Sequence, residues 1–214
     1  VGIERIRLSS IELPWITDDL IDIFIKNAKI CKHLHIPLQS GDNRILSLMK
    51  RKYDTNKYEM TIRKLRENIP DIAITTDVIV GFPGEDNNSF EKTCKFIEKM
   101  SFARIHVFPF SDRMHSLASL LPEKVEKNII KERVMKLNNL SKELQRNFFF
   151  KNIGQNKNIL VEYHERKNEK NYICGLTDNY IKVCAFDIKA RVGEMIKLEL
   201  KKVMDSHVEG EISI

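Results

Sequence analysis

The sequence predicts an α/β fold in which a partial parallel barrel is followed by a small antiparallel β-barrel. Three observations support this prediction. Strand-like and helix-like segments alternate over residues 1–122, which is typical of βα units and a parallel sheet. A long helical pattern dominates residues 123–153. Residues 154–214 contain about five short, alternating segments rich in β-branched side chains, as in a small barrel. We therefore expect three regions with these bounds.

Four segments of the first region are expected to be strands that lead into turns: residues 4–10, 33–41, 71–84 and 103–111. In the first of them, Ile6 and Leu8 alternate with charged side chains. Four βα units are too few to close an eightfold barrel. A complete barrel enzyme with another cofactor is therefore disfavoured, and the sheet is expected to be only part of a barrel.

Helical periodicity predicts helices at residues 17–29, 43–52, 55–68, 87–100 and 123–151. Their apolar stripes should face the sheet. The stripe consists of Leu20, Ile23 and Phe24 in the helix at 17–29, and of Tyr58, Ile62 and Leu65 in the helix at 55–68. In the helix at 87–100 it consists of Phe90, Cys94 and Ile97. Gly154 is expected to end the long helix, because glycine commonly follows the last helical turn.

Composition and charge narrow the class of protein. Of the 214 residues, 42% are hydrophobic, enough for a sizeable core, and the net charge is +6 with a pI near 9.0, which favours a polyanionic partner. No apolar run approaches the roughly 20 residues of a membrane helix. The chain begins with neither an initiator methionine nor a signal peptide, so we expect it to be part of a longer protein.

The four cysteines, Cys31, Cys94, Cys174 and Cys184, are separated by 63, 80 and 10 residues. None of these separations is the CxxC spacing that metal or cluster ligation favours. The sequence therefore predicts scattered reduced thiols in a cytoplasmic protein, each acting as a small buried apolar side chain, and no metal site.

Unusual residues gather at the predicted carboxyl ends of the strands, where parallel α/β folds bind ligands. These residues are Ser10, Gln39, Ser40, Asp77, Gly81, Gly84, Glu85 and Phe108. Glycine permits close backbone approach or positive φ, and Gln39 and Ser40 offer donors and acceptors suited to ribose hydroxyls or an amino-acid group. A simple strand-to-helix turn at Gly81–Gly84 is an alternative, and Asp77 could instead bind backbone amides. His33 and His35 have no further ligand at metal spacing nearby.

A basic segment covers residues 44–66. It holds two acidic side chains, Asp54 and Glu59, and eight basic ones, namely Arg44, Lys50, Arg51, Lys52, Lys57, Arg63, Lys64 and Arg66. Tyr53 and Tyr58 interleave with them, as on a surface that contacts phosphates and stacks on bases. An ordinary solvated helix face is the alternative. Residues 154–214 carry ten basic and ten acidic side chains, so charge alone predicts no RNA contact there.

Four stretches together resemble the radical S-adenosylmethionine methylthiotransferases: RIRLSSIE, HLHIPLQSGDNRILSLMKRKY, DIAITTDVIVGFPGE and RIHVFPFS. The resemblance extends over essentially the whole chain, and residues 154–214 resemble the family's TRAM domain. The most similar subgroup is the MtaB type. Its members add a methylthio group to C2 of N6-threonylcarbamoyladenosine next to the tRNA anticodon.

The resemblance implies S-adenosylmethionine as cofactor, with two [4Fe-4S] clusters in the whole enzyme. Their cysteine ligands are absent from this chain, which would begin at the third of six barrel strands and be inactive alone. The implied cofactor contacts are Ser10, Gln39, Ser40, Asp77, Gly81, Glu85 and Phe108. The implied partner is a tRNA anticodon stem-loop, with Lys50, Arg51, Lys52, Tyr53 and Arg113 as RNA contacts.

Other functions remain open at this stage. The chain could act as a stand-alone RNA-binding module. It could also belong to a methylthiotransferase that acts on isopentenyladenosine in tRNA or on a ribosomal protein.

Overall fold

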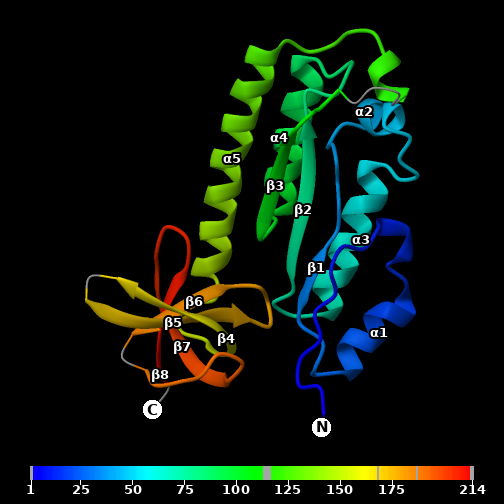
Figure 1. Ribbon diagram of the computed structural model, residues 1–214. Helices are drawn as coiled ribbons and strands as arrows, with labels where there is room; N and C mark the ends of the chain where they lie inside the picture. Colours follow the sequence, from blue (N-terminus) through cyan, green and yellow to red (C-terminus); the bar gives the residue numbers. More distant parts are fainter. Residues whose placement is uncertain (1, 113–116, 168, 187, 213–214) are drawn as a thin grey trace.

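A computed structural model describes residues 2–112, 117–167, 169–186 and 188–212. A three-stranded sheet flanked by helices forms one part, and a closed β-barrel forms the other (Figure 1). The helix α5 (Lys127–Phe150) runs beside the sheet and leads into the barrel. Among the described residues, no helix is both long and apolar enough to cross a membrane.

The sheet is parallel, as predicted, and has the order β1 (His33–His35), β2 (Ala73–Val80) and β3 (Arg104–Pro109). The predicted strand at residues 4–10 is wrong as a continuous strand. In the described part of the chain, its β-pairing consists of two isolated parallel bridges, Ile6 with Ile30 and Ser10 with His35. It lies at the sheet edge beside a strand of three residues, so few backbone partners are available to it.

The first four helices begin where a polar side chain caps them. Thr17, Asp42, Asp54 and Asp86 each accept a backbone N–H. The helices that follow are α1 (Asp18–Lys26), α2 (Asn43–Leu48), α3 (Thr55–Asn68) and α4 (Asn87–Met100). Two short 3-10 helices cover Leu13–Trp15 and Leu117–Leu120.

The main core lies between the sheet and the helices. The stripes predicted for α3 and α4 are confirmed, since Tyr58, Ile62 and Leu65 and likewise Phe90, Cys94 and Ile97 are buried against it. The buried side of α1 differs from the predicted stripe. Ile21 and Phe24 are buried, whereas Ile23 is 46% exposed, so the prediction for Ile23 is wrong. Alternate side chains of β2, such as Ile74 and Val78, face this core.

The second part is a closed barrel with strand order β4-β5-β6-β8-β7. Its strands are β4 (Asn156–Lys167), β5 (Lys170–Thr177), β6 (Lys182–Phe186), β7 (Met195–Val203) and β8 (Val208–Ile212). The predicted five-stranded barrel is confirmed, but β6 and β8 pair in parallel, so the barrel is not wholly antiparallel. Gly154 has φ of +80° and donates to the Leu200 carbonyl, so it serves the entry into the barrel, after α5 has ended at Phe150.

The barrel is attached to the lower end of the sheet by polar contacts. Arg5 donates to the carbonyls of Leu176 and Asn158 at 2.8 and 2.9 Å, and Arg7 donates to that of Thr177 at 2.8 Å. The charged residues that alternate with Ile6 and Leu8 therefore bind the barrel, which explains why this segment is extended although it is scarcely paired in the sheet.

The prediction of four reduced thiols is wrong for two of them. Cys174 on β5 and Cys184 on β6 form a disulfide, with Cα atoms 4.3 Å apart. Their separation of ten residues spans a hairpin whose register pairs them directly. Cys31 and Cys94 are free and buried, as expected.

Candidate functional site

Polar side chains line the face of the sheet opposite to the main core. Because strand side chains alternate, Thr75 and Asp77 of β2 face away from the core that holds Ile74 and Val78. The register places Thr75 beside His35 and Asp77 beside His106. We call this surface, made up of His33, His35, Thr75, Asp77, His106 and Phe108, the inner sheet face.

The inner sheet face holds a continuous polar chain. The Thr75 hydroxyl lies 3.0 Å from His33 Nε2 and 3.0 Å from His35 Nδ1. His35 Nε2 in turn lies 3.2 Å from Asp77 Oδ2, and the His35 and His106 rings are 5.7 Å apart. No backbone amide of the described residues donates to the Asp77 carboxylate, so the alternative that Asp77 binds backbone amides is wrong.

Two of the imidazoles are neutral near pH 7. Burial lowers the pKa of His106, and the nearby Arg104 lowers it further against the opposing effect of Asp77. Burial lowers the pKa of His33 to about 3, with Arg7 and His35 adding to the shift. Sequence reasoning assigned no role to His106. The alternation in RIHVFPFS, which puts His106 on the same face as Phe108, is the signal that could have found it.

Gln39 lies at the end of this face. Its backbone has φ of +67°, a strained value for a residue other than glycine. Its N–H donates to the Asp77 carbonyl at 2.8 Å and its own carbonyl accepts from Ile79 at 2.9 Å. Within the described part of the chain its side-chain amide has no hydrogen-bond partner, so the amide is available to a ligand.

Three other predicted strand-end residues, Ser40, Ser10 and Phe108, differ in burial and in their contacts. Ser40 is buried, with its hydroxyl 3.3 Å from that of Thr93 and accepting the Asp42 N–H, so it is engaged within the protein. Ser10 is exposed beside His35. Phe108 is 49% exposed and pairs in register with Ile79, the residue that Gln39 binds. The structure thus brings Gln39, Asp77 and Phe108 to neighbouring positions.

The Gly81–Glu85 turn packs against α5. Glu85 is buried and accepts from Arg133 Nη1 at 2.7 Å and from the Gly81 N–H at 3.0 Å. A Cβ on Gly81, where φ is +78°, would lie 2.3 Å from Cγ1 of Ile130 on α5. A side chain at Gly81 would therefore meet α5, which favours the simple turn over a cofactor contact at this position. Gly81 and Glu85 serve the packing of a tight turn, the alternative considered above.

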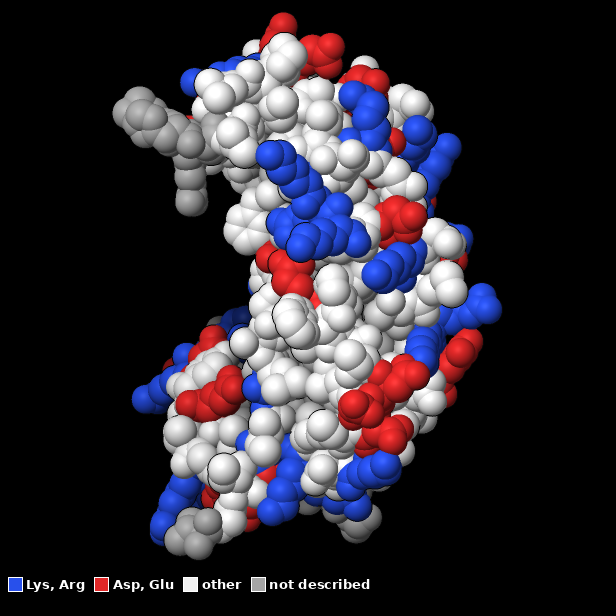
Figure 2. All heavy atoms as spheres, turned by 90° about the vertical axis from the view of Figure 1, so that its right-hand side faces the viewer, with Lys and Arg blue, Asp and Glu red and all other residues white. Residues whose placement is uncertain are grey.

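Most of the basic segment is engaged in contacts within the protein. Arg44 pairs with Asp86, Arg51 with Glu12 and Arg63 with Glu67, each at 3.2 Å. Lys64 pairs with Asp18, and Arg66 donates to the Met100 carbonyl. Figure 2 shows basic side chains interspersed with acidic ones on this side of the molecule. Lys50, Lys52 and Lys57 are exposed and have no ion-pair partner in the described part of the chain.

The expectation that Tyr53 and Tyr58 stack on bases is wrong. Both rings are buried, and the Tyr53 hydroxyl donates to the carbonyls of Pro37 and Leu38 at 2.9 and 3.2 Å. Burial raises the pKa of Tyr53 to about 12. Helical spacing placed Tyr58 correctly in the α3 stripe, and its ring lies 6.0 Å from that of Tyr53. Arg113, the remaining predicted RNA contact, lies outside the described residues.

Tyr53→Phe is expected to lower the free energy of unfolding by about 1–2 kcal/mol, because two buried carbonyls lose a donor. Urea unfolding measures this loss, and Tyr163→Phe, at a ring 37% exposed on the barrel, is the matched control and should change little. Unchanged stability of Tyr53→Phe would contradict the burial of this hydroxyl.

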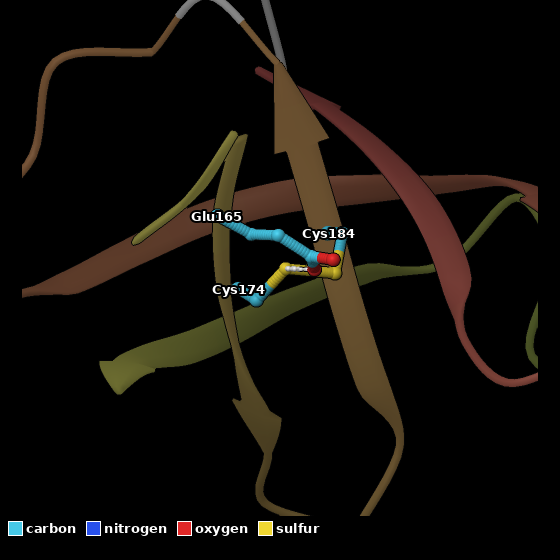
Figure 3. A group of neighbouring side chains, drawn as sticks. All are labelled: Glu165, Cys174 and Cys184. Carbon is cyan, nitrogen blue, oxygen red and sulfur yellow. Dashed lines mark hydrogen bonds between the residues drawn. A yellow bond between two sulfur atoms is a disulfide. The ribbon is translucent and has the colours of Figure 1, made fainter. Parts of the chain in front are cut away.

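Donor sets for metals are scarce in the described part of the chain. One group of three brings potential ligand atoms within 4.8 Å of one another: Glu165, Cys174 and Cys184 on the barrel (Figure 3). An iron–sulfur cluster takes cysteine thiolates as ligands. Cys31 and Cys94 are each buried in the main part of the fold, and no described residues there form a set that fits such a cluster.

Comparison with known proteins adds to this geometry. Residues 2–97 match the Radical SAM superfamily. The threonylcarbamoyladenosine tRNA methylthiotransferase MtaB of Bacillus subtilis is 37% identical over 98% of this chain. The resemblance to the radical SAM methylthiotransferases is thereby confirmed. A second methylthiotransferase relative, the tRNA-2-methylthio-N(6)-dimethylallyladenosine synthase of Acetivibrio thermocellus, is also 37% identical, over 99% of the chain.

The chain spans about half the length of these methylthiotransferases, 47% of the first and 44% of the second. Among solved structures, coproporphyrinogen III oxidase (HemN) from Escherichia coli, a radical SAM enzyme, superposes with a TM-score of 0.54. The match covers 65% of this chain and 32% of the other at 16% identity, so it supports the fold alone.

Proposed function

We propose that this chain is part of a tRNA methylthiotransferase, to which it contributes a section of the radical SAM sheet and an RNA-contacting barrel. The observation that carries the proposal is similarity along nearly the whole chain to enzymes named for this reaction. The neighbouring positions of Gln39, Asp77 and Phe108 on the sheet support it, because ligands of parallel α/β folds bind toward the carboxyl ends of the strands.

In this proposal the inner sheet face would hold S-adenosylmethionine, which would supply the radical chemistry of methylthiolation when bound. The free amide of Gln39 and the Asp77 carboxylate would hold its polar groups, and the half-exposed ring of Phe108 would contact its apolar surface. His35 would fix the Asp77 carboxylate, and the neutral His106 would add no positive charge. The chain's own part is to bind and orient the cofactor.

The substrate we favour is N6-threonylcarbamoyladenosine next to the anticodon, modified at C2. Relatives from Bacillus subtilis, Thermotoga maritima and Aquifex aeolicus carry that nucleoside in their names, the last at 41% identity over 80% of the chain. Synthases named for dimethylallyladenosine match at comparable identity, so this nucleoside is the alternative. A tRNA substrate implies that the protein acts in the cytoplasm.

Two surfaces would contact the tRNA backbone. One is the turn between α2 and α3, with exposed Lys50 and Lys52. The other is a cleft of about 710 Å³ on the barrel, to which Arg166, Lys189 and Arg191 contribute; Glu165 and Glu194 also line it. Although residues 154–214 carry equal numbers of basic and acidic side chains, this cleft is more basic than acidic. An RNA-binding module without enzymatic activity is the second candidate function.

Deletion of the reading frame that encodes this chain, followed by mass spectrometry of tRNA nucleosides, tests the proposal. Loss of the 2-methylthio derivative of N6-threonylcarbamoyladenosine is expected, with restoration by the reintroduced gene. Loss of the isopentenyladenosine derivative instead would establish the alternative substrate. Unchanged levels of both would refute the proposed activity and leave the RNA-binding module to be considered.

Lys50→Ala combined with Lys52→Ala is expected to weaken binding of an anticodon stem-loop RNA. It should also reduce the log–log salt slope by about 1.4–1.8, if both side chains contact phosphate. Fluorescence anisotropy at several salt concentrations measures both effects. Lys64→Ala is the matched control, because Lys64 already pairs with Asp18. An unchanged slope in the double variant would remove this turn from the RNA-contacting surface.

A further inference from the structure

Two cysteines and a carboxylate converge on the outer side of the barrel, where three neighbouring strands lie next to each other (Figure 3). Glu165 comes from β4, Cys174 from β5 and Cys184 from β6. The register pairs Cys174 with Cys184, and Glu165 Oε2 lies 3.9 Å from Cys174 Sγ. Neither cysteine belongs to the apolar core inside the barrel, whereas the adjacent Ile173, Val183 and Ala185 do.

The donor atoms match a particular class of cation. Two thiolates and one carboxylate oxygen suit a thiophilic divalent metal such as zinc, and three protein ligands leave one coordination position open. Both sulfur atoms are buried, while Glu165 is exposed, so an ion and its fourth ligand would enter from the Glu165 side. Strand pairing sets the spacing of all three residues, so little ordering is needed when an ion binds.

Once the disulfide is reduced, the negative charges of the three ligand side chains favour binding of a metal ion. Two thiolates and the carboxylate carry a formal charge of −3, which a divalent ion reduces to −1. Lys182 lies two residues before Cys184 on the same face of β6, where its ammonium sits 5.5 Å from the centre of the Tyr163 ring. This cation compensates part of the remaining charge. Without a metal ion, two adjacent buried thiolates would repel each other.

We propose that Cys174, Cys184 and Glu165 form a thiol site that binds a zinc ion once the disulfide between the two cysteines has been reduced. With a phosphine reductant, the Sγ–Sγ bond breaks, both sulfur atoms become thiols, and the phosphine takes the oxygen of one water molecule. Zinc then displaces both thiol protons. The site uses none of the residues of the inner sheet face, so it is separate from the proposed cofactor site, although Glu165 also lines the barrel cleft proposed to contact tRNA.

Cobalt(II), a spectroscopic substitute for zinc, tests the site in the 214-residue chain under argon. After phosphine reduction, one equivalent is expected to bind with sulfur-to-cobalt charge-transfer absorption, and zinc should displace it. Cys184→Ser should abolish that absorption. Glu165→Gln, at an exposed position, should weaken binding by at least about tenfold, because loss of a ligand costs no less than loss of an outer contact. The chain with its disulfide intact should not bind cobalt.

Two matched variants control for position and for thiol content. Glu162→Gln removes an exposed carboxylate from the same strand, and Cys94→Ser removes a buried thiol from the other part of the molecule. Both should bind cobalt as the unsubstituted chain does. If circular dichroism shows that Cys184→Ser does not fold, the cobalt binding of Glu165→Gln and of the oxidised chain decides whether the proposal holds. Absence of the sulfur band in the reduced chain, unweakened binding by Glu165→Gln, or equal binding by the oxidised chain would overturn the proposal.

Discussion

Arg133→Met is expected to lower the free energy of unfolding by about 3–5 kcal/mol, because it leaves a buried carboxylate without its partner. Arg133 and Glu85 are 6% and 4% exposed, and the guanidinium reaches the carboxylate at 2.7 Å. Arg133 also donates to the Glu85 carbonyl and to Asn87 Oδ1, and it lies 5.1 Å from the centre of the Phe90 ring. One side chain therefore joins α5 to the turn that follows β2.

The pKa of the Glu85 carboxyl determines how the stability loss of Arg133→Met changes with pH. Burial raises the pKa of Glu85, while the Gly81 N–H and Arg133 act in the opposite direction. Removing Arg133 removes one of these opposing effects, so the pKa of Glu85 should rise further in the variant. A carboxyl whose pKa is raised in the folded state stabilises the protein at low pH and loses that contribution as pH rises. The deficit of Arg133→Met should therefore narrow on acidification from pH 7 to about pH 5.

Urea unfolding of three variants tests this ion pair. Lys136→Met is the matched control on the same helix, because its ion pair with Glu91 is about half exposed and should contribute little. Adding Glu85→Gln to Arg133→Met should recover part of the loss, since the buried charge is then removed. A loss below about 1 kcal/mol for Arg133→Met would contradict the burial of this pair.

The ion pair explains why the candidate cofactor face depends on a helix distant in sequence. The Gly81–Glu85 turn follows β2 directly, and β2 carries Asp77 on the inner sheet face. Loss of Arg133 releases the end of β2 from α5, so we expect the position of Asp77 relative to Gln39 to change as well. Reduced cofactor binding by Arg133→Met would then be an indirect effect, not evidence that Arg133 touches the ligand.

Local periodicity predicted which elements form and which side of a helix is buried. The spacing of Tyr58, Ile62 and Leu65 placed the inward side of α3, and alternating strands and helices predicted the parallel sheet. It could not predict which distant residue completes a buried pair. Glu85 reads as a strand-end acid open to a ligand until Arg133, 48 residues later, is seen beside it. Periodicity likewise gave no means of recognising that Tyr53, outside any predicted helix, donates to the Pro37 carbonyl.

Prediction of the candidate sites from the sequence was limited in the same way. The rule that ligands bind at carboxyl ends of parallel strands correctly brought Gln39 near Asp77. The metal argument used sequence spacing, which cannot detect that strand register places Cys174 opposite Cys184. It also considered His33 and His35 only as ligands, although hydrogen bonds to Thr75 give both a structural role. Hydrogen bonds and register across strands depend on the folded chain, so one-dimensional patterns leave them undetermined.

His33 is expected to make the folded chain lose stability as the pH falls. Its ring is 4% exposed, stacks on Tyr180 of the barrel at 4.1 Å, and has no partner for Nδ1 in the described part of the chain. Arg7 lies 5.0 Å from the centre of the same Tyr180 ring. A proton on His33 would thus be buried beside a permanent cation, which is why burial, with help from Arg7, lowers its pKa from 6.5 to about 3.

Between these two pKa values the unfolded chain binds a proton on this residue that the folded chain does not. Stability contributed by neutral His33 is therefore complete above about pH 6.5 and declines by about 1.4 kcal/mol per pH unit below it. Urea unfolding should show a loss of about 2–3 kcal/mol from this residue between pH 7 and pH 4.5. His33→Gln should remove that part of the slope, whereas His164→Gln, at an exposed barrel position, should leave it intact. Equal slopes for His33→Gln and the unsubstituted chain would show that protonation of His33 does not oppose the contact between sheet and barrel.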